Sequence, residues 1–242
     1  MDDERAQRAR SFGQVAGLYE RWRPGYPDAL YTDVLELGPG GQVLEAGAGT
    51  GRATLALARR GASILAVEPD PAMAAVARRR TQGMAVEVQE STFEDCSVLP
   101  GTFDLVVAAQ SWHWVDGERG PPVAARALRP GGALCLWWNR PRELAGPVWD
   151  AIHEAYAEHA PALDRRATLH QQPEREQQVE PALGFTPWIT RTYDWSVTYD
   201  AESYGGLVQT HSDHLQLPPP QRERLTDAIG RAINNVGAGR LE

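Results

Sequence analysis

The chain has 242 residues, of which 42% are hydrophobic and 23% charged, a composition typical of a globular protein with room for one large α/β domain. Its net charge of −8 argues against a nucleic-acid substrate, because affinity for phosphates comes largely from a basic surface. No apolar stretch approaches the ~20 residues that a membrane span needs, so we expect no membrane partner.

The N-terminal segment, residues 1–34, is polar and predicted to be helical, with breaks at Pro24 and Pro27. No apolar run follows its first charged residues, so we do not expect a secretory signal. The two cysteines, Cys96 and Cys135, form neither a CxxC pair nor a disulfide framework. We therefore expect a cytoplasmic protein.

Between residues 42 and 139, short apolar runs alternate with helical stretches. Near-continuous apolar strands that alternate with helices predict an α/β fold, with a doubly wound, mostly parallel sheet and helices on both faces. One helix has a clear start, with Asp70 as N-cap and Pro71 at the first helical position. The expected strands are 42–47, 63–68, 85–89, 103–110 and 133–138, and the expected helices are 52–60, 70–80 and 123–128, the last ended by the Pro-Gly-Gly turn 130–132.

The C-terminal part has a different pattern. An amphipathic stretch begins near residue 149, an alternating run over 189–199 predicts a strand, and residues 201–235 are predicted to be mostly helical. No internal repeat or long linker marks a domain boundary, so we predict a single domain over residues 1–242.

The strongest local signal is the glycine-rich segment from Glu45 to Gly51 (EAGAGTG), which follows the first expected strand and opens a helix. Glycines there let the backbone turn tightly and approach a ligand, and a helix N-terminus adds unpaired N–H groups. Counting from Gly47, the sixth position of a dinucleotide fingerprint is Arg52 instead of glycine, and the Gly-Lys-Ser/Thr of a P-loop is absent. A tight turn without a ligand is the alternative.

This segment resembles the first motif of class I methyltransferases, acidic-x-Gly-x-Gly-x-Gly. The resemblance implies a Rossmann-like fold whose glycine loop wraps the amino-acid end of S-adenosyl-L-methionine, with an acidic side chain oriented toward it. Glu68 lies roughly 20 residues further on, where a carboxylate can accept hydrogen bonds from both ribose hydroxyls. Its alternative role is helix capping. The cofactor-binding residues expected in this region are Glu45, Gly47, Ala48, Gly49, Gly51, Glu68 and Pro69.

The segment from Phe12 to Pro27 resembles the opening of a bacterial small-molecule branch of this family, related to type 11, ubiquinone/menaquinone-type and trans-aconitate methyltransferases. The resemblance implies an N-terminal helical lid in which Tyr19 and Arg23 meet the cofactor and Tyr26 meets the substrate. The alternative is a packed helix, because aromatic residues at helical spacing usually belong to a core.

Two loops after strands extend the resemblance. Thr92 and Phe93 occupy the position of the family's adenine-contacting loop, although Thr92 stands where an acidic residue is usual. The segment from Gln110 to Asp116 (QSWHWVD) resembles a signature that ends in His-Trp-Val-Asp, which implies that Gln110 contacts the cofactor. Substrate contacts are expected from the aromatic side chains of Trp112, Trp114 and Trp138, which are otherwise core residues, and from His211.

Methyl transfer depends mainly on holding the nucleophile in line with the methyl carbon, and it needs a base only where the acceptor must lose a proton. His113 is the candidate base or substrate-orienting residue, with a packed histidine as the alternative. His211 and His214 lie three residues apart, but two histidines without a third ligand do not predict a metal site, so we expect no metal.

The sequence thus predicts transfer of a methyl group from S-adenosyl-L-methionine to an oxygen, nitrogen or carbon nucleophile of a small-molecule metabolite, with S-adenosyl-L-homocysteine as product. We expect a monomer or homodimer without nucleic acid. One alternative is a non-catalytic cofactor sensor or partner subunit. A nicotinamide-dependent reductase is disfavoured by the early Gly51 and the absence of lysine for a Tyr-x-x-x-Lys pair.

Within the single domain, the resemblance implies a lid at 1–34, a cofactor-binding core at 35–139, a small helical cap insertion at 140–187 and a C-terminal strand with helices at 188–242. The family normally ends in a seventh, antiparallel strand. This sequence ends at Glu242, about where that strand would begin, so we expect the final strand to be missing.

Overall fold

The computed structural model describes residues 16–140, 145–164, 184–211 and 213–241. The chain divides into two compact units. In the described part, the first unit contains residues 16, 25–139 and 184–194, and the second contains residues 17–24, 140, 145–164, 195–211 and 213–241. Each unit has its own hydrophobic core.

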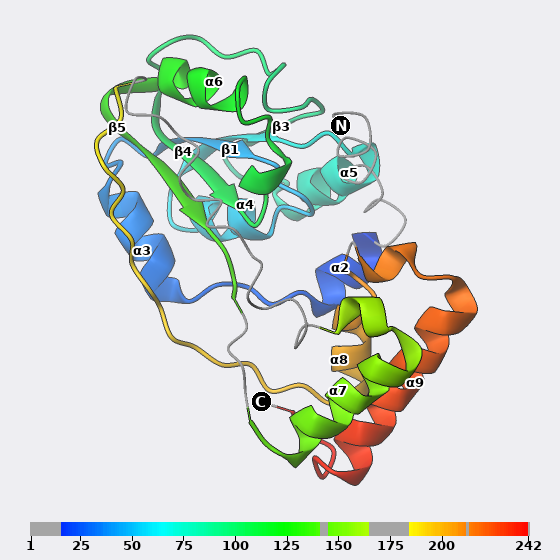
Figure 1. The fold of residues 1–242 in the computed structure, drawn as a ribbon. Coiled ribbons are helices and arrows are strands. Elements are labelled where there is room, and N and C mark those ends of the chain that lie inside the picture. The colour runs from blue at the N-terminus through cyan, green and yellow to red at the C-terminus, as the bar shows by residue number, and fades with distance from the viewer. Residues whose placement is uncertain (1–15, 141–144, 165–183, 212, 242) are drawn as a thin grey trace. The chain divides into compact units, whose positions relative to one another are not determined.

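The first unit is built on a five-stranded sheet in which every neighbouring pair is parallel (Figure 1). The spatial order is β3-β2-β1-β4-β5, so the direction of winding reverses between β1 and β4. Ligands of such sheets bind outside the carboxyl ends of the strands at this switch point. The strands are β1 (Gln42–Ala46), β2 (Ser63–Val67), β3 (Val86–Gln89), β4 (Phe103–Ala109) and β5 (Leu128–Trp137).

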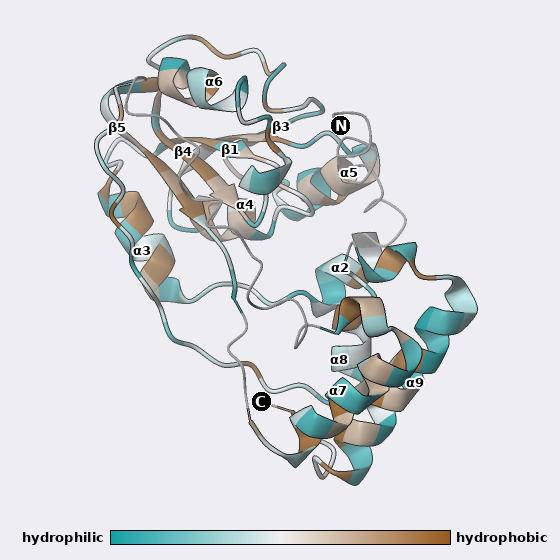
Figure 2. Cartoon of the chain, in the orientation of Figure 1, coloured by the Kyte–Doolittle hydropathy of each residue, from teal (hydrophilic) through white to brown (hydrophobic). Residues whose placement is uncertain are grey.

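Alternating side chains of the central strands feed two separate cores, one on each face of the sheet. Val43 and Leu105 pack with residues of α3 (Asp28–Glu36) and α4 (Arg52–Ala58), whereas Leu44 and Val106 pack with α6 (Gly120–Ala127). In Figure 2, α3 carries hydrophobic and hydrophilic residues on the same helix, as a half-buried helix does. The predicted parallel α/β sheet with helices on both faces is confirmed.

Local signals also set the start of α5 (Pro71–Arg80). The Asp70 carboxylate accepts hydrogen bonds from the backbone N–H groups of Ala72 at 2.8 Å and Met73 at 3.0 Å. The predicted N-cap and the proline at the first helical position are therefore confirmed.

The helix before Pro130 ends at Ala127, close to the predicted end, but Pro130, Gly131 and Gly132 already lie inside β5, which begins at Leu128 and not at residue 133 as predicted. Phe103 pairs with Leu128 and Leu105 with Ala133, so β5 carries extra residues at an irregularity of the β4–β5 ladder. Gly132 allows this close passage, since a Cβ there would lie 2.8 Å from the carbonyl oxygen of Asp104.

The predicted strand over 189–199 is also wrong: among the described residues of this segment, only Tyr199 makes a β-type pairing, an isolated antiparallel bridge to Leu241. The alternating side chains have another use. Arg191 and Tyr193 both donate hydrogen bonds to the carboxylate of Asp33 on α3, each at 2.6 Å. Side-chain contacts, instead of a ladder, attach this extended segment to the first unit.

The second unit is a group of helices: residues 17–22 of α2 (Ala16–Trp22), α7 (Pro147–His159), α8 (Ala201–Val208) and α9 (Pro219–Asn235). Its core contains Ile152, Val208, Leu225, Ile229 and Ile233. Trp22 packs closely against Gly206 of α8, where an added Cβ would lie 2.2 Å from the nearest atom of the indole ring. The predicted helical content of 201–235 is confirmed.

Among the described residues, no helix combines the length and apolarity that crossing a membrane requires.

Candidate active site

The glycine loop folds tightly onto the carboxyl end of β2. Gly47, Gly49 and Gly51 have φ values of +68°, +58° and +77°, a region that other residues enter only at a cost. The backbone N–H groups of Gly47 and Ala48 both donate to the carbonyl oxygen of Val67, at 2.9 and 3.0 Å. The three glycines are therefore required by the backbone path.

The space around each glycine differs. A Cβ at Gly47 would lie 2.6 Å from the Cβ of Ser111, and one at Gly51 would lie 3.1 Å from Ala77. A Cβ at Gly49 would meet nothing within 4 Å. Gly47 and Gly51 thus permit packing within the protein, while Gly49 borders open space through which a ligand can approach the backbone.

Glu45, near the end of β1, is only 1% exposed. Its Oε2 accepts a hydrogen bond from the hydroxyl of Thr54 at 2.5 Å, but its Oε1 has no hydrogen-bond partner in the described part of the chain. Burial raises the pKa of Glu45 to about 7, and the nearby charge of Glu68 adds to the rise. A buried acceptor without a partner is costly, and a cationic donor such as an ammonium group would satisfy it.

Glu68 follows β2 and holds the glycine loop to that strand end. Its Oε2 accepts from the N–H of Gly49 at 2.7 Å, and its Oε1 accepts from the N–H of Asp70 at 2.9 Å. Burial raises the pKa of Glu68 to about 7 although both hydrogen bonds lower it. A carboxylate has about four acceptor sites, so the same group can accept further donors from a ligand.

The loops that follow β3 and β4 are tied to each other. The rings of Phe93 and Trp112 meet edge to face with centroids 5.7 Å apart, and both residues are buried in the core on the α6 side. The Glu94 carboxylate accepts a hydrogen bond from the N–H of Asp116. The expected substrate residue Trp112 thus lies where it packs the core and fixes this pair of loops.

Thr92, at the expected adenine-contacting position, is hydrogen-bonded to a neighbouring side chain. Thr92 donates its hydroxyl hydrogen to Asp95 at 2.9 Å, and Asp95 pairs with Arg119 at 2.6 Å. The Arg119 guanidinium and the Thr92 hydroxyl lower the pKa of Asp95. The hydroxyl oxygen of Thr92 keeps acceptor capacity.

Gln110, directly after β4, has φ +60°, an unusual conformation for a residue other than glycine. Its N–H donates to the carbonyl oxygen of Trp137 at 2.9 Å, and this contact holds the strained residue at the sheet edge. Strained residues cluster at functional sites, which agrees with the position expected for Gln110. The next residue, Ser111, was missed by sequence reasoning: its hydroxyl donates to the carbonyl oxygen of Ala46 and its side chain fills the space that Gly47 leaves.

His113 and Trp114 lie on the short 3-10 helix Trp112–Trp114 and are both half-buried. Their ring centroids are 4.7 Å apart at an angle of 46°. The candidate base is therefore held against an indole ring at the switch-point edge of the sheet.

Three aromatic rings cluster on the other face of the sheet, at the end of β5. Tyr26 lies 5.9 Å from Trp137 and 6.2 Å from Tyr31, and Tyr31 lies 6.5 Å from Trp137, all edge to face. Trp138 points to the opposite, α6-side core. Tyr26 therefore contacts Trp137 and does not share a face with Trp138.

The remaining expected residues, Tyr19, Arg23 and His211, belong to the second unit, and their part in the site stays a prediction. Arg23 donates from Nε to the hydroxyl of Thr210 at 2.8 Å and from its terminal nitrogen to the carbonyl oxygen of the same residue at 3.0 Å. Its guanidinium lies 5.1 Å from the ring centre of Tyr19. These contacts attach α2 to the end of α8.

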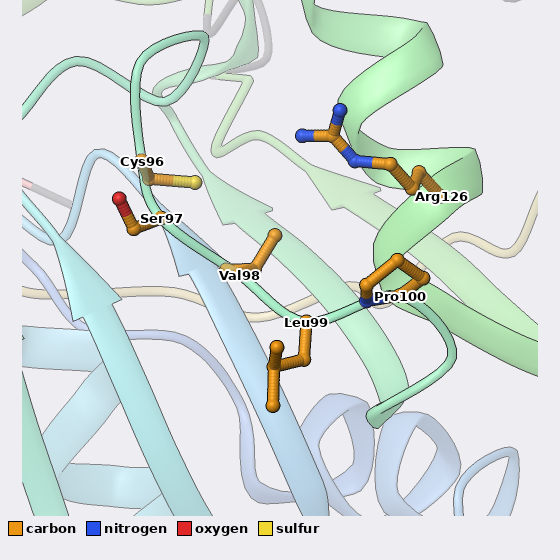
Figure 3. A pocket seen from close by; sticks show the side chains of 6 residues that line it. All are labelled: Cys96, Ser97, Val98, Leu99, Pro100 and Arg126. Carbon is orange, nitrogen blue, oxygen red and sulfur yellow. The ribbon is translucent and has the colours of Figure 1, made fainter.

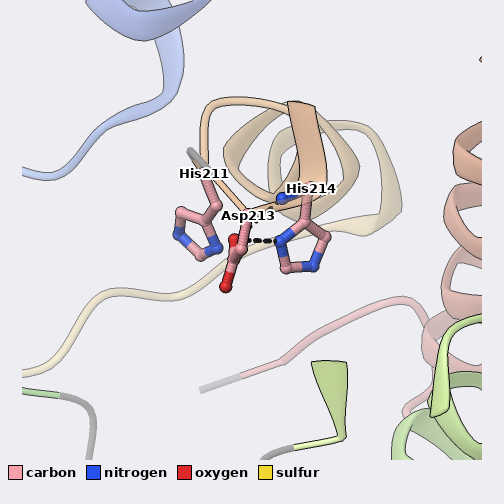
Figure 4. A group of neighbouring side chains, drawn as sticks. All are labelled: His211, Asp213 and His214. Carbon is pink, nitrogen blue, oxygen red and sulfur yellow. Dashed lines mark hydrogen bonds and ion pairs between the residues drawn. The ribbon is translucent and has the colours of Figure 1, made fainter. Parts of the chain in front are cut away.

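His211 also belongs to a polar cluster with Asp213 and His214 (Figure 4). His214 is buried, and its Nδ1 lies 2.6 Å from Oδ1 of Asp213 while its Nε2 lies 2.9 Å from the hydroxyl of Tyr156. One ligand atom from each of the three residues falls within 4.8 Å of the others. Because both ring nitrogens of His214 have protein partners, a metal would have to displace one of them.

A surface pocket of about 500 Å³ lies beside residues 96–100 and Arg126 (Figure 3). Burial raises the pKa of the Cys96 thiol there, which makes it less reactive. None of the expected site residues lines this pocket.

Comparison with known proteins shows a family of similar sequences, and the matched region includes the glycine loop. The family described as "Methyltransferase domain" matches residues 44–136. An uncharacterized methyltransferase of Mycobacterium bovis is 42% identical over 236 residues, covering 96% of this chain and 89% of the relative. An uncharacterized methyltransferase-like protein of Schizosaccharomyces pombe is 35% identical over 240 residues, covering 94% and 88%.

A solved structure, described as a type II methyltransferase from Anaeromyxobacter dehalogenans, superposes with a TM-score of 0.63 over 90% of this chain and 91% of its own, at 23% identity. At this identity the likeness concerns the fold, which is the Rossmann-like fold of class I methyltransferases. The family match and the similarity to methyltransferase sequences show that the cofactor is S-adenosylmethionine. This chain belongs to the class I S-adenosylmethionine-dependent methyltransferase family.

Proposed function

We propose that this methyltransferase acts on an oxygen, nitrogen or carbon nucleophile of a small-molecule metabolite, in the cytoplasm, as a monomer or homodimer. The observation that carries the proposed site is the buried Oε1 of Glu45, which has no partner among the described residues and lies below the glycine loop. The net charge of −8 favours a small acceptor over a nucleic acid.

The proposed cofactor contacts follow from the donors and acceptors at the strand ends. Glu45 would accept from the ammonium group, the open side of Gly49 would let the methionine end approach the backbone, and Glu68, followed by Pro69, would accept from the ribose hydroxyls. Adenine would lie against the loop of Thr92 and Phe93. The full proposed set is Glu45, Gly47, Ala48, Gly49, Gly51, Glu68, Pro69, Thr92, Phe93, Gln110, Tyr19 and Arg23.

Bound S-adenosylmethionine supplies an electrophilic methyl group on a sulfonium. The residues around it have to exclude water, orient the acceptor and, where the acceptor is protonated, take up a proton. We assign the last task to His113, whose ring is held against Trp114. Trp114 and His211 complete the proposed acceptor side; Trp112 packs the core, and Tyr26 and Trp138, which lie on opposite faces of the sheet, are not assigned to it together.

Turnover tests this proposal. The full chain would be incubated with S-adenosylmethionine labelled in the methyl group and with pools of phenolic, carboxylic, amine and carbon-acid metabolites, and both labelled product and S-adenosylhomocysteine would be measured. We expect stoichiometric formation of the two with at least one pool. Binding of S-adenosylmethionine without turnover in any pool would favour the sensor alternative.

The role of His113 is tested with the acceptor found in that screen. For an acceptor that must lose a proton, His113→Gln should lower kcat by about 100-fold and leave the Kd for S-adenosylmethionine unchanged. Trp114→Phe, which keeps an aromatic ring beside the histidine, is the matched control. An unchanged kcat in His113→Gln would remove the histidine from the proton-transfer step.

A further inference from the structure

We propose that a pocket along α4, next to the glycine loop but lined by none of its residues, binds an anionic small molecule with two or more phosphate or carboxylate groups. The pocket is an open hollow of about 400 Å³ within the first unit, a volume in the range of small-molecule sites. It is lined by Gly25, Tyr26, Asp28, Tyr31, Arg52, Leu55, Ala56, Arg59, Arg60 and Arg80.

One face of α4 and the turn after it supplies most of the lining. Arg52, Leu55, Ala56, Arg59 and Arg60 recur at the spacing of a single helical face. Two apolar residues thus lie between cationic ones along the same wall. This arrangement suits a ligand with charged groups at separate points.

The charge of the lining is unusual for this chain. Four arginines face one acidic side chain, Asp28, among the described residues that line the pocket, although the whole protein has a net charge of −8. Asp28 is paired with Arg60 at 2.6 Å. An excess of arginine over acidic side chains among the described lining residues favours anionic ligands over cationic ones.

Some of the guanidinium groups are already held in place. Arg60 donates to the carbonyl oxygen of Ala56 at 2.8 Å and stacks over the ring of buried Tyr31, 4.8 Å from its centre. Arg80 donates to the carbonyl oxygen of Thr50 at 3.1 Å. Side chains that are ordered before binding lose less entropy when a ligand arrives.

The helix dipole does not account for the set by itself. It favours Arg59 and Arg60 at the carboxyl end of α4, but it disfavours Arg52, which is the first residue of the helix. A planar, multi-donor guanidinium is also the side chain best suited to bidentate contacts with phosphate or carboxylate. A polyanion accounts for all four arginines together.

Calorimetric titration of the full chain with pyrophosphate, and separately with citrate, at about 0.15 M salt tests the proposal, because nonspecific attraction is largely screened there. We expect saturable binding of at least one of them, weakened at least tenfold in Arg59→Ala/Arg60→Ala. The single variant Arg59→Ala should show a smaller loss in the same direction and guards against misfolding of the double variant. Binding of pyrophosphate alone indicates a phosphorylated ligand, and binding of citrate alone indicates a polycarboxylate.

The control is Arg126→Ala/Arg240→Ala, which removes the same charge from exposed positions elsewhere and should bind as the wild type does. S-adenosylmethionine is added as a second ligand and should neither displace the anion nor bind differently to Arg59→Ala/Arg60→Ala. The proposal is overturned by no saturable binding of either anion, by an equal loss in the control, or by displacement with S-adenosylmethionine, which would place the anion in the cofactor site.

Discussion

Two buried polar side chains, one in each unit, differ in how completely they are hydrogen-bonded. In the first unit, Glu45 is 1% exposed and one of its carboxylate oxygens has no partner in the described part of the chain. In the second, His214 is 2% exposed and both of its ring nitrogens are engaged, with Asp213 and Tyr156. Burial is thus common to both groups, and what distinguishes Glu45 is the oxygen that lacks a hydrogen-bond donor among the described residues.

The ionisation of the two clusters reflects this difference. Burial dominates at Glu45 and raises its pKa to about 7. Burial also acts to raise the pKa of Asp213, but the hydrogen bond and charge of His214, with the charge of His211, lower it overall. In the second unit, histidines compensate the charge of Asp213, whereas no cationic side chain contributes to lowering the pKa of Glu45.

The largest effect should come from breaking the compensated cluster. His214→Ala leaves the Tyr156 hydroxyl and the Asp213 carboxylate without their buried partner, and we expect a loss of about 3 kcal/mol in the free energy of unfolding. Tyr156→Phe removes only one hydroxyl and should cost about 1 kcal/mol. Denaturant unfolding of both variants measures the difference, and a His214→Ala protein as stable as the wild type would contradict the assigned role.

The next largest difference in stability should be between alanine substitutions at Gly47 and at Gly49 of the glycine loop. Gly47→Ala and Gly49→Ala both put a side chain at positive φ, but only the first brings its Cβ within 2.6 Å of Ser111. We expect Gly47→Ala to lose about 2 kcal/mol more stability than Gly49→Ala. Gly49→Ala should lose only the roughly 1 kcal/mol that a side chain costs at positive φ, yet bind S-adenosylmethionine more weakly. Equal melting temperatures for the two variants would show that the contact with Ser111 is relieved at little cost.

The raised pKa of Glu45 should make the stability of the folded protein depend on pH. The pKa of Glu45 rises from 4.5 to about 7, so between these values the folded protein keeps a proton that the unfolded chain has lost. The contribution of Glu45 to the free energy of unfolding is therefore greatest below pH 4.5. It decreases as the pH rises and is lost above about pH 7. Glu68 acts with the same sign.

Glu45→Gln removes that penalty and keeps an acceptor for Thr54. In the absence of ligand, we expect the variant to be more stable than the wild type by about 1–2 kcal/mol at pH 8 and by nothing measurable at pH 4.5. Thermal melts at both pH values, with the exposed Glu87→Gln as control, measure it. A gain of the same size at both pH values would contradict a charge-based cause.

The smallest effect should come from an exposed ion pair. Arg21 and Glu202 lie 3.0 Å apart with side chains 65% and 71% exposed. Because solvent screens such pairs, Arg21→Ala should change stability by less than about 0.5 kcal/mol. A loss comparable to that of His214→Ala would show that this surface of the second unit is more tightly coupled than its exposure indicates.

The sequence was most informative where the signal is local. Apolar runs predicted the parallel sheet, Asp70 and Pro71 predicted the start of α5, and the spacing of the glycines predicted the loop. Each of these depends on residues within a few positions of one another. Local chemistry therefore sufficed for the core of the first unit.

Features that depend on distant partners could not be predicted. Ser111 meets Ala46 across 65 residues, and Tyr156 meets His214 across 58, with no pattern in the sequence that pairs them. The alternating run after residue 188 predicted a strand, but its side chains Arg191 and Tyr193 donate hydrogen bonds to Asp33 on α3 instead. Alternation shows that side chains face two ways, and only the tertiary structure shows what each face meets.

The central claim, that the unsatisfied oxygen of Glu45 receives the cofactor's ammonium group, is tested most directly by calorimetric titration with S-adenosylmethionine at pH 8. We expect micromolar binding to the wild type and to Glu87→Gln, and at least about thirtyfold weaker binding to Glu45→Gln, a difference of about 2 kcal/mol. Equal affinity in the wild type and Glu45→Gln would contradict the claim and leave the buried carboxylate without its ligand.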